Sequence, residues 1–264
     1  MINIIFIGDI VGRPGRRVLT QHIDSLRDEY EADLVIANIE NAAAGFGITS
    51  KILDELFRLG VDVMTSGNHI WDKQEALEFI DDEPRLLRPL NYPAETPGHG
   101  IYIATTPQGE KLAIVNLMGA VFMHPTLDCP FSAIDGVLDK VREQTPCVFV
   151  DFHAEVTSEK MAMAWHLDNR ASAVIGTHTH IPTADERILP GGCATLSDAG
   201  MTGCYDSVIG MDKDISVQRF INKLPRRFQV ASGKGSLRGV HIRIDPASGK
   251  ATHIERVSRE EAGS

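Results

Sequence analysis

The chain begins with a short apolar run that ends in glycine and aspartate, INIIFIGD at residues 2–9. Branched and aromatic side chains in so short a run are typical of a buried β-strand. In the next segment Leu19, Ile23 and Leu26 are spaced by four and three residues, which predicts an amphipathic helix. A second apolar run, LVIA at residues 34–37, predicts another strand. This alternation of strand, helix and strand favours an α/β fold.

The alternation continues along much of the chain. A helix is predicted near residues 50–58 and a third strand over 61–65. Residues 84–110 carry several Pro and Gly, and the strands after them are expected to be antiparallel or mixed. Further strands are predicted at 101–104, 112–117, 147–152 and 173–177, helices near 132–143 and 158–167, and short strands at 193–197 and 237–257. Since no repeat or linker divides the chain, residues 1–264 are interpreted as a single domain.

Composition restricts the class of protein. Of 264 residues, 43% are hydrophobic and 23% are charged, which is typical of a globular protein and excludes wholly disordered and fibrous chains. The formal charge is 26 minus 36, or −10, so a generally basic protein that coats nucleic acid is not expected. The four cysteines form no Cys-x-x-Cys pair, and no signal peptide or membrane-spanning stretch is recognisable. These features predict a cytoplasmic protein with free thiols and no membrane association.

Side chains that can bind a metal follow five of the predicted strands. They are Asp9, then Glu40 and Asn41, then Asn68 and His69, then His153, then His178 and His180. One such residue alone is more often a helix cap or an ordinary polar residue. However, the carboxyl ends of strands in an α/β sheet face a common ligand site, so the coincidence favours one site.

The kinds of side chain indicate the kind of metal. Carboxylates, amides and imidazoles without thiolates suit Fe, Mn, Zn or Co. With His69 set aside, the seven candidate ligands exceed the needs of one four-coordinate ion. A pair of ions that share a carboxylate fits this number, and such pairs can clamp the oxygens of a phosphoryl group.

In their order, these motifs resemble the calcineurin-like metallophosphoesterase superfamily, and in detail they are similar to its YmdB-like branch. The blocks are FIGDIVG at 6–12, NIEN at 38–41, GNHIWD at 67–72, DFHAE at 151–155, GTHTH at 176–180 and SDAGMTG at 197–203. The commonest superfamily pattern has His where this chain has Val11, and Asp where it has Glu40. The YmdB-like pattern has the Glu and the neighbouring Asn41, so the differences indicate the branch. They leave the metal preference open, because a carboxamide replaces an imidazole.

The resemblance implies a four-layer αββα sandwich with mixed sheets and two metal ions, with Fe or Mn preferred and Zn as an alternative. It implies that the first ion is bound by Asp9, Glu40, Asn41 and His180. It implies that the second ion is bound by Glu40, Asn68, His153 and His178, so that Glu40 bridges the two. His69 would donate a proton to the leaving oxygen, or would instead orient Asn68.

The implied activity is a phosphodiesterase that hydrolyses cyclic nucleotides, such as 2′,3′-cyclic nucleotides, by attack of a metal-bridged hydroxide. Two alternatives stay open: a phosphomonoesterase with the same site, and a regulatory protein that senses a nucleotide with little turnover.

Residues 216–244 form a basic segment without Asp or Glu. Its cations are Arg219, Lys223, Arg226, Arg227, Lys234, Arg238 and Arg243. In an acidic chain this asymmetry suggests a phosphate- or RNA-binding surface. A solvated basic face and a contact between subunits of a homo-oligomer are the alternatives. Phe46 and Trp71 are candidates for stacking a base near the site, or for the core.

Overall fold

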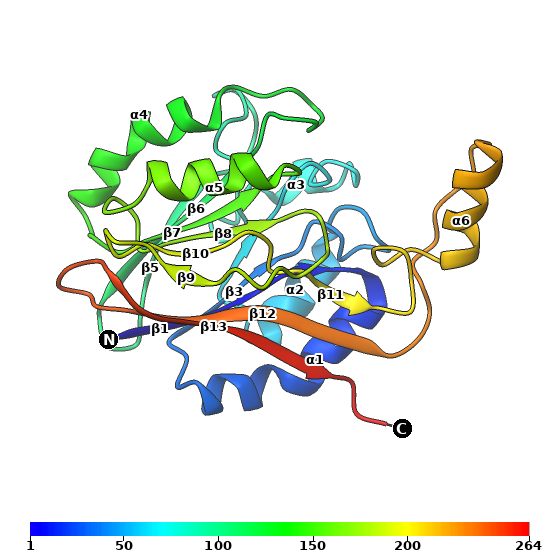
Figure 1. The fold of residues 1–264 in the computed structure, drawn as a ribbon, viewed down its shortest axis with the longest axis horizontal. Helices are drawn as coiled ribbons and strands as arrows, with labels where there is room; N and C mark the ends of the chain where they lie inside the picture. The colour runs from blue at the N-terminus through cyan, green and yellow to red at the C-terminus, as the bar shows by residue number, and fades with distance from the viewer. Residues whose placement is uncertain (264) are drawn as a thin grey trace.

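The computed structural model describes residues 1–263, which fold into two β-sheets packed face to face between helices (Figure 1). The first sheet has seven strands: β1 (Ile2–Ile7), β2 (Asp9–Ile10), β3 (Leu34–Asn38), β4 (Val63–Thr65), β11 (Met201–Cys204), β12 (Gly235–Ile244) and β13 (Ala251–Glu260). Their order is β2-β11-β12-β1-β3-β4, and β13 pairs with β12. This sheet is mixed, because β1 runs parallel to β3 and antiparallel to β12.

The second sheet has six strands in the order β5-β6-β7-β8-β10-β9. They are β5 (Ile101–Thr105), β6 (Lys111–Met118), β7 (Val148–His153), β8 (Ala173–Thr177), β9 (Arg187–Ile188) and β10 (Ala194–Leu196). Strands β6, β7 and β8 are parallel, whereas β5 and β9 join antiparallel at the two edges. Both sheets are therefore mixed, as predicted.

The helices cover the outer faces of the two sheets. Helices α1 (Gly12–Glu29) and α2 (Ser50–Arg58) pack on the first sheet, and α4 (Pro130–Arg142) and α5 (Thr157–His166) pack on the second (Figure 1). A short helix, α3 (Ala76–Phe79), follows β4, and α6 (Lys213–Asn222) projects away from the layers. The order of layers is helix, sheet, sheet, helix, which confirms the predicted αββα sandwich.

Successive side chains along the strands point to opposite faces, and this divides the hydrophobic core into three layers. In β1, Ile5 and Ile7 pack with α1 and α2, whereas Ile4 and Phe6 face the second sheet. Successive side chains of a strand point to opposite faces, so one apolar strand contributes to two layers. Phe6 meets Phe149 of β7 with ring centroids 5.1 Å apart. Each such buried side chain stabilises the fold by about 1.5–3 kcal/mol.

Most predicted elements are present within a few residues of their predicted bounds. One prediction is wrong in detail, and helix α6 is among the elements for which the sequence analysis made no prediction. Strands β12 and β13 have 10 residues each and form one long antiparallel hairpin, instead of the short strands expected at 237–257. Helix α6 was not predicted. Its sequence does carry a helical spacing, because Val217, Phe220 and Ile221 stand at i, i+3 and i+4. The helix is capped by Asp212, whose carboxylate accepts a hydrogen bond from the Ile215 N–H (2.9 Å).

The carboxyl ends of strands from both sheets meet at one place. Asn38, at the end of β3, donates through Nδ2 to Asp151 of β7 in the other sheet (3.0 Å). Thr65, at the end of β4, donates to the same carboxylate. The polar residues that follow these strands are thereby brought together. Within residues 1–263, no helix combines the length and the apolar character needed to span a membrane.

Candidate metal centre

The centre of the site is a cluster of three donors from three different strand ends. Glu40 follows β3, His153 ends β7, and His178 follows β8, and each offers an atom within 4.8 Å of the others. His153 Nε2 lies 3.1 Å from Glu40 Oε1 and 3.1 Å from His178 Nδ1. Tetrahedral and octahedral metal ions hold neighbouring ligand atoms at similar separations. The cluster can therefore accept a metal with little rearrangement.

Two further predicted ligands contact this cluster directly. Asn68 Oδ1 lies 3.1 Å from His153 Nε2, on the same side of the ring as Glu40. Asp9 accepts a hydrogen bond from the His178 backbone N–H (3.3 Å), and its other oxygen lies 3.9 Å from His153 Nδ1. Asp9, Glu40 and His153 are almost fully buried. Five of the seven predicted ligands thus lie in one contiguous group.

Asn41 and His180 lie at the edge of the group. Together with Glu40 and His178 they line a cavity of about 540 Å³. Asn41 Nδ2 donates to the Gly45 carbonyl (3.0 Å), and His180 Nδ1 lies 2.8 Å from the Ile209 carbonyl. These contacts involve Asn41 Nδ2 and His180 Nδ1, and they leave Asn41 Oδ1 and His180 Nε2 as the atoms that could bind a metal. The structure places all seven predicted ligands at one site, and their division between two ions stays a prediction.

Unpaired oxygens provide a test of whether metal ions fit here. Asp9 Oδ1 and Asn41 Oδ1 are buried and have no hydrogen-bond partner among the described residues. Buried acceptors without a partner are unfavourable by roughly 1–3 kcal/mol each, and a coordinated cation removes this penalty. Together with the imidazole nitrogens and Glu40, these oxygens form the donor set expected for a dinuclear site. The residues present fit metal ions.

Gly67 allows the donors to approach one another. A Cβ atom at this position would lie 2.1 Å from His153 Cδ2 and 2.5 Å from Glu40 Oε2. No side chain other than hydrogen fits there unless both ligands move. The GNH motif therefore supplies two kinds of residue to the site: the donor Asn68, and a glycine that leaves room for the neighbouring donors.

Burial and charge set the protonation of the cluster. Burial alone would lower the pKa of His153, but the charges of Glu40 and Asp9 outweigh it and raise this pKa to about 9. Burial would raise the pKa of Glu40, but His153 and the His69 N–H lower it to about 2. Burial and the neighbouring charge of His153 lower the pKa of His178 to about 3. The metal-free site at neutral pH thus contains a carboxylate, an imidazolium and a neutral imidazole.

His69 lies beside the cluster and is not part of it. Its backbone N–H donates to Glu40 Oε2 (3.0 Å), and its Nδ1 lies 2.9 Å from Asp72 Oδ2. The ring lines the same cavity and meets Phe46 edge-on, with centroids 4.9 Å apart. Trp71, the other predicted stacking residue, instead packs edge-on against Tyr92. Of the two aromatic candidates, only Phe46 lines the cavity.

Asp151 was not predicted as a site residue, although it belongs to the DFHAE motif. It accepts a hydrogen bond from the Thr177 hydroxyl (2.7 Å), which lies 2.9 Å from His153 Nδ1. This chain of contacts holds the Nδ1 side of His153 and leaves Nε2 for the cluster, a typical arrangement behind a metal-binding histidine. Burial raises the pKa of Asp151 to about 7.

A buried ion pair holds the loop that carries the other two histidines. Lys160 Nζ lies 2.7 Å from Asp198 Oδ2. The same oxygen accepts hydrogen bonds from the backbone N–H (3.1 Å) and hydroxyl (2.8 Å) of Thr179. On either side, His178 and His180 have φ values of 100° and 66°, which are unfavourable for residues with a side chain. The SDAGMTG motif thus contributes Asp198, whose contacts stabilise this strained loop.

Glu155 completes the surroundings of His178. Its Oε2 lies 3.1 Å from His178 Nε2, so this nitrogen can donate to the carboxylate while Nδ1 faces the cluster. Glu155 also lines the cavity. Like Asp151, it could have been found from the DFHAE motif, because both residues lie two positions from His153.

The chain is similar to known proteins over nearly its whole length. The sequence matches the profile of the family described as YmdB-like protein over residues 5–257. It is 50% identical over 257 residues to the 2′,3′-cyclic-nucleotide 2′-phosphodiesterase of Bacillus subtilis (strain 168), covering 97% of this chain and 96% of the relative.

Two crystal structures are similar along nearly the whole chain. A hypothetical protein from Thermus thermophilus superposes with a TM-score of 0.93 at 42% identity, covering 99% of this chain and 100% of that one. A novel phosphatase from Mycoplasma pneumoniae superposes with a TM-score of 0.92 at 33% identity, covering 98% and 94%. On this evidence of sequence and fold, the chain belongs to the YmdB-like protein family.

Proposed function

We propose that this protein is a metal-dependent phosphodiesterase that hydrolyses 2′,3′-cyclic nucleotides. The observation that carries the proposal is the buried cluster of Glu40, His153 and His178, beside the unpaired oxygens of Asp9 and Asn41. The cavity that it lines is of a size typical for a small-molecule substrate. The activity named for the Bacillus subtilis relative supports the choice of substrate.

Two metal ions fit the donors present. Asp9, Glu40, Asn41 and His180 would hold one, and Glu40, Asn68, His153 and His178 would hold the other. We expect Fe or Mn, with Zn as the alternative, because the donors are oxygens and imidazoles without thiolates. Such ions, when bound, activate water and offset negative charge on phosphoryl oxygens.

His69 is suited to protonate the leaving oxygen. Asp72 accepts from Nδ1, so a ring that carries both protons would give the one on Nε2 to a substrate in the cavity. Hydrolysis would break the bond between phosphorus and O2′, place the hydroxyl of water on phosphorus, and leave a proton on O2′. General acid catalysis of this kind contributes about 10²–10⁴-fold to a rate.

Contacts between the two sheets support one functional unit over residues 1–264. The Asn38–Asp151 and Thr65–Asp151 hydrogen bonds join the layers directly behind the cluster. The donors also come from both sheets, so neither sheet alone provides the site. We therefore propose that the chain acts as a single domain.

The test combines metal content with turnover. Wild type and Glu40→Ala would be assayed for metal by mass spectrometry and for hydrolysis of 2′,3′-cyclic AMP, bis(p-nitrophenyl) phosphate and p-nitrophenyl phosphate. We expect about two metals per chain in the wild type, faster turnover of diesters than of the monoester, and loss of both metal and activity in Glu40→Ala. Preference for the monoester would indicate a phosphomonoesterase. Tight binding of the cyclic nucleotide without hydrolysis by metal-loaded protein would indicate a sensor.

A further inference from the structure

A projecting segment lies beside the cavity of about 540 Å³ at the candidate metal centre, which we call the metal cavity. We call residues 213–228, which comprise α6 and the six residues after it, the arm (Figure 1). Ser216, Phe220 and Phe228 of the arm line the metal cavity, together with Glu40 and His178. A substrate that occupies the cavity would therefore touch the arm as well as the metal donors.

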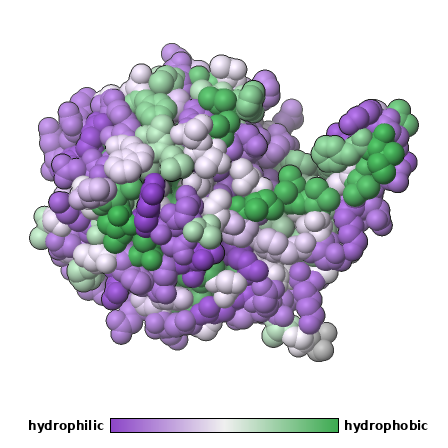
Figure 2. Space-filling model, in the orientation of Figure 1, coloured by the Kyte–Doolittle hydropathy of each residue, from purple (hydrophilic) through white to green (hydrophobic). Residues whose placement is uncertain are grey.

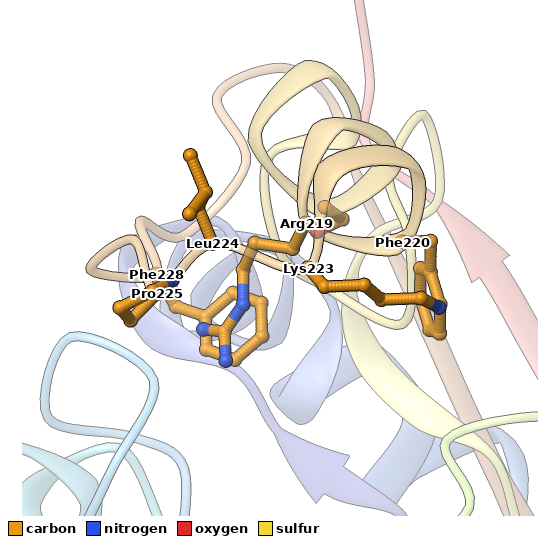
Figure 3. Close-up of a pocket in the computed structure, with 7 residues that line it drawn as sticks. Arg219, Phe220, Lys223, Leu224, Pro225 and Phe228 are labelled. Atoms are coloured by element: carbon orange, nitrogen blue, oxygen red, sulfur yellow. The ribbon is translucent and has the colours of Figure 1, made fainter.

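A second cavity, of about 400 Å³, lies on the arm itself (Figure 3). It is lined by Arg219, Lys223, Leu224 and Pro225 together with the same three residues that line the metal cavity. Because Ser216, Phe220 and Phe228 line both, the two cavities adjoin across these side chains. A ligand longer than one nucleotide would have to cross these three side chains to reach the second cavity.

The second cavity carries cations that no carboxylate neutralises. None of the ion pairs within residues 1–263 includes Arg219 or Lys223. The segment 216–244 contains no acidic residue, whereas the whole chain has a charge of −10. Cations concentrated at the mouth of one site in an acidic protein attract an anionic ligand to that site.

The cations are combined with aromatic rings. The Arg219 guanidinium lies 3.9 Å from the centroid of Phe228, and its NH1 donates to the Arg226 carbonyl (2.8 Å). Lys223 Nζ lies 5.8 Å from the centroid of Phe220 (Figure 3). A flat guanidinium held on an aromatic ring offers a surface on which a base can stack, as in proteins that bind single-stranded nucleic acid.

We propose that the arm binds the nucleotide that precedes the reacting one, so that the substrates include single-stranded oligoribonucleotides that end in a 2′,3′-cyclic phosphate. This inference rests on the proposed function. The terminal cyclic phosphate would lie at the metal donors, and the preceding phosphodiester would pass Phe220 and Phe228 to reach Arg219 and Lys223. The preceding base would stack on the Arg219–Phe228 pair.

The arm also has exposed apolar residues, visible as a green band from the body onto the arm in Figure 2. They include Ile221 (69% exposed) and Leu224 (59% exposed), and Phe220 is 72% exposed. A second copy of the chain is the other occupant that such a surface could take. The cations, which line the second cavity and have no acidic partner, favour the oligonucleotide.

The experiment compares kcat/KM for 2′,3′-cyclic AMP with that for a trinucleotide that ends in the same cyclic nucleotide. The variant is Arg219→Ala with Lys223→Ala. The matched control is Arg227→Ala, which removes a cation of the same segment that lines neither cavity. We expect the wild type to prefer the trinucleotide by about tenfold, the order contributed by stacking one base. The double variant should lose this preference and keep its activity on 2′,3′-cyclic AMP, and the control should resemble the wild type.

Salt dependence provides a second readout. Loss of one or two phosphate contacts should reduce the slope of log kcat/KM against log salt by about 0.7 per contact, for the trinucleotide only. Equal kcat/KM for both substrates in the wild type, or an equal loss for both in the double variant, would overturn the inference. A third result would also overturn it: a wild type that shows no preference for the trinucleotide and forms a dimer, seen by light scattering, which Leu224→Asp dissociates.

Failure of the proposed function gives a different result, because metal-loaded wild type would then hydrolyse neither substrate. In that case, binding of a fluorescent trinucleotide with a 3′-phosphate tests the arm directly. Binding that weakens with salt and in the double variant supports the inference, and no binding by the wild type overturns it.

Discussion

Replacement of Gly67 by alanine tests whether close approach of the donors is essential. The added Cβ would lie 2.1 Å from His153 Cδ2. Carbon atoms in contact are about 3.5–4.0 Å apart, so the ring would have to move by roughly 3.5 − 2.1 to 4.0 − 2.1, or about 1.4–1.9 Å. A misplacement of about 1 Å at a reacting centre can lower a rate by about 100-fold. We therefore expect Gly67→Ala to lose at least about 100-fold in turnover of a cyclic nucleotide.

The assay measures turnover, metal content and thermal unfolding together. Gly136→Ala is the matched control, because Gly136 lies on the exposed face of α4 and a Cβ there meets nothing within 4 Å. This control should keep full activity and gain about 0.5–1 kcal/mol of stability, as expected for alanine in a helix. If Gly67→Ala kept two metals per chain and activity within threefold of the wild type, the reasoning about donor approach would be refuted.

Further predictions concern protons, the buried ion pair, the proposed general acid and the proposed metal ions. Because the pKa of His153 is raised to about 9 in the metal-free protein, His153 is protonated below this pH and must lose its proton to bind a metal. Metal affinity should thus rise by about tenfold per pH unit up to about pH 9, with close to one proton released per chain. Calorimetry in buffers of different ionisation enthalpy measures both quantities, and a metal affinity independent of pH would contradict this prediction. Lys160→Met should destabilise the fold by about 3–5 kcal/mol in urea unfolding, because Asp198 would keep an unpaired buried charge. The side chains of Lys160 and Asp198 are only 4% and 2% exposed. A change below about 1 kcal/mol would show that the ion pair contributes little to stability. His69→Ala should lower kcat by about 10²–10⁴-fold with metal content unchanged, and loss of metal would instead make His69 a ligand. Removal of metal with a chelator should lower both activity and Tm, and added Mn²⁺ or Fe²⁺ should restore both; a Tm that does not change would mean that the ions contribute nothing to stability.

The candidate ligands were predictable because each follows a strand. Asp9, Glu40 and His153 have a residue type and a position in the chain that are visible in the sequence, and parallel strands bring such positions to one edge. The supporting residues were not predictable in this way. Asp198 and Lys160 are 38 residues apart, and a lone Asp or Lys is ordinary in any sequence. Only the fold places them within hydrogen-bond distance.

The arm shows a second limit of the sequence. Secondary structure was predicted from apolar periodicity, which arises when one face of an element is buried. In α6 the periodic pattern is present at Val217, Phe220 and Ile221, but these apolar side chains are exposed and only Ser216 is buried, so the pattern does not mark a face packed on the core. The positive charge of residues 216–244 is visible in the sequence. That two of its cations line a cavity next to the metal donors depends on how the arm is placed relative to the two sheets, which only the fold shows.

The division of the donors between the sheets has a consequence for the life of the protein in a cell. Glu40 and Asn68 follow strands of one sheet, whereas His153 ends a strand of the other sheet and His178 follows one. Bound ions would therefore link the two sheets to each other. Chains that lack metal would lose catalysis and this link between the sheets at the same time. They would open more often, and proteases degrade opened chains first. Cellular abundance of the enzyme would then follow the supply of its metal, without any dedicated regulator.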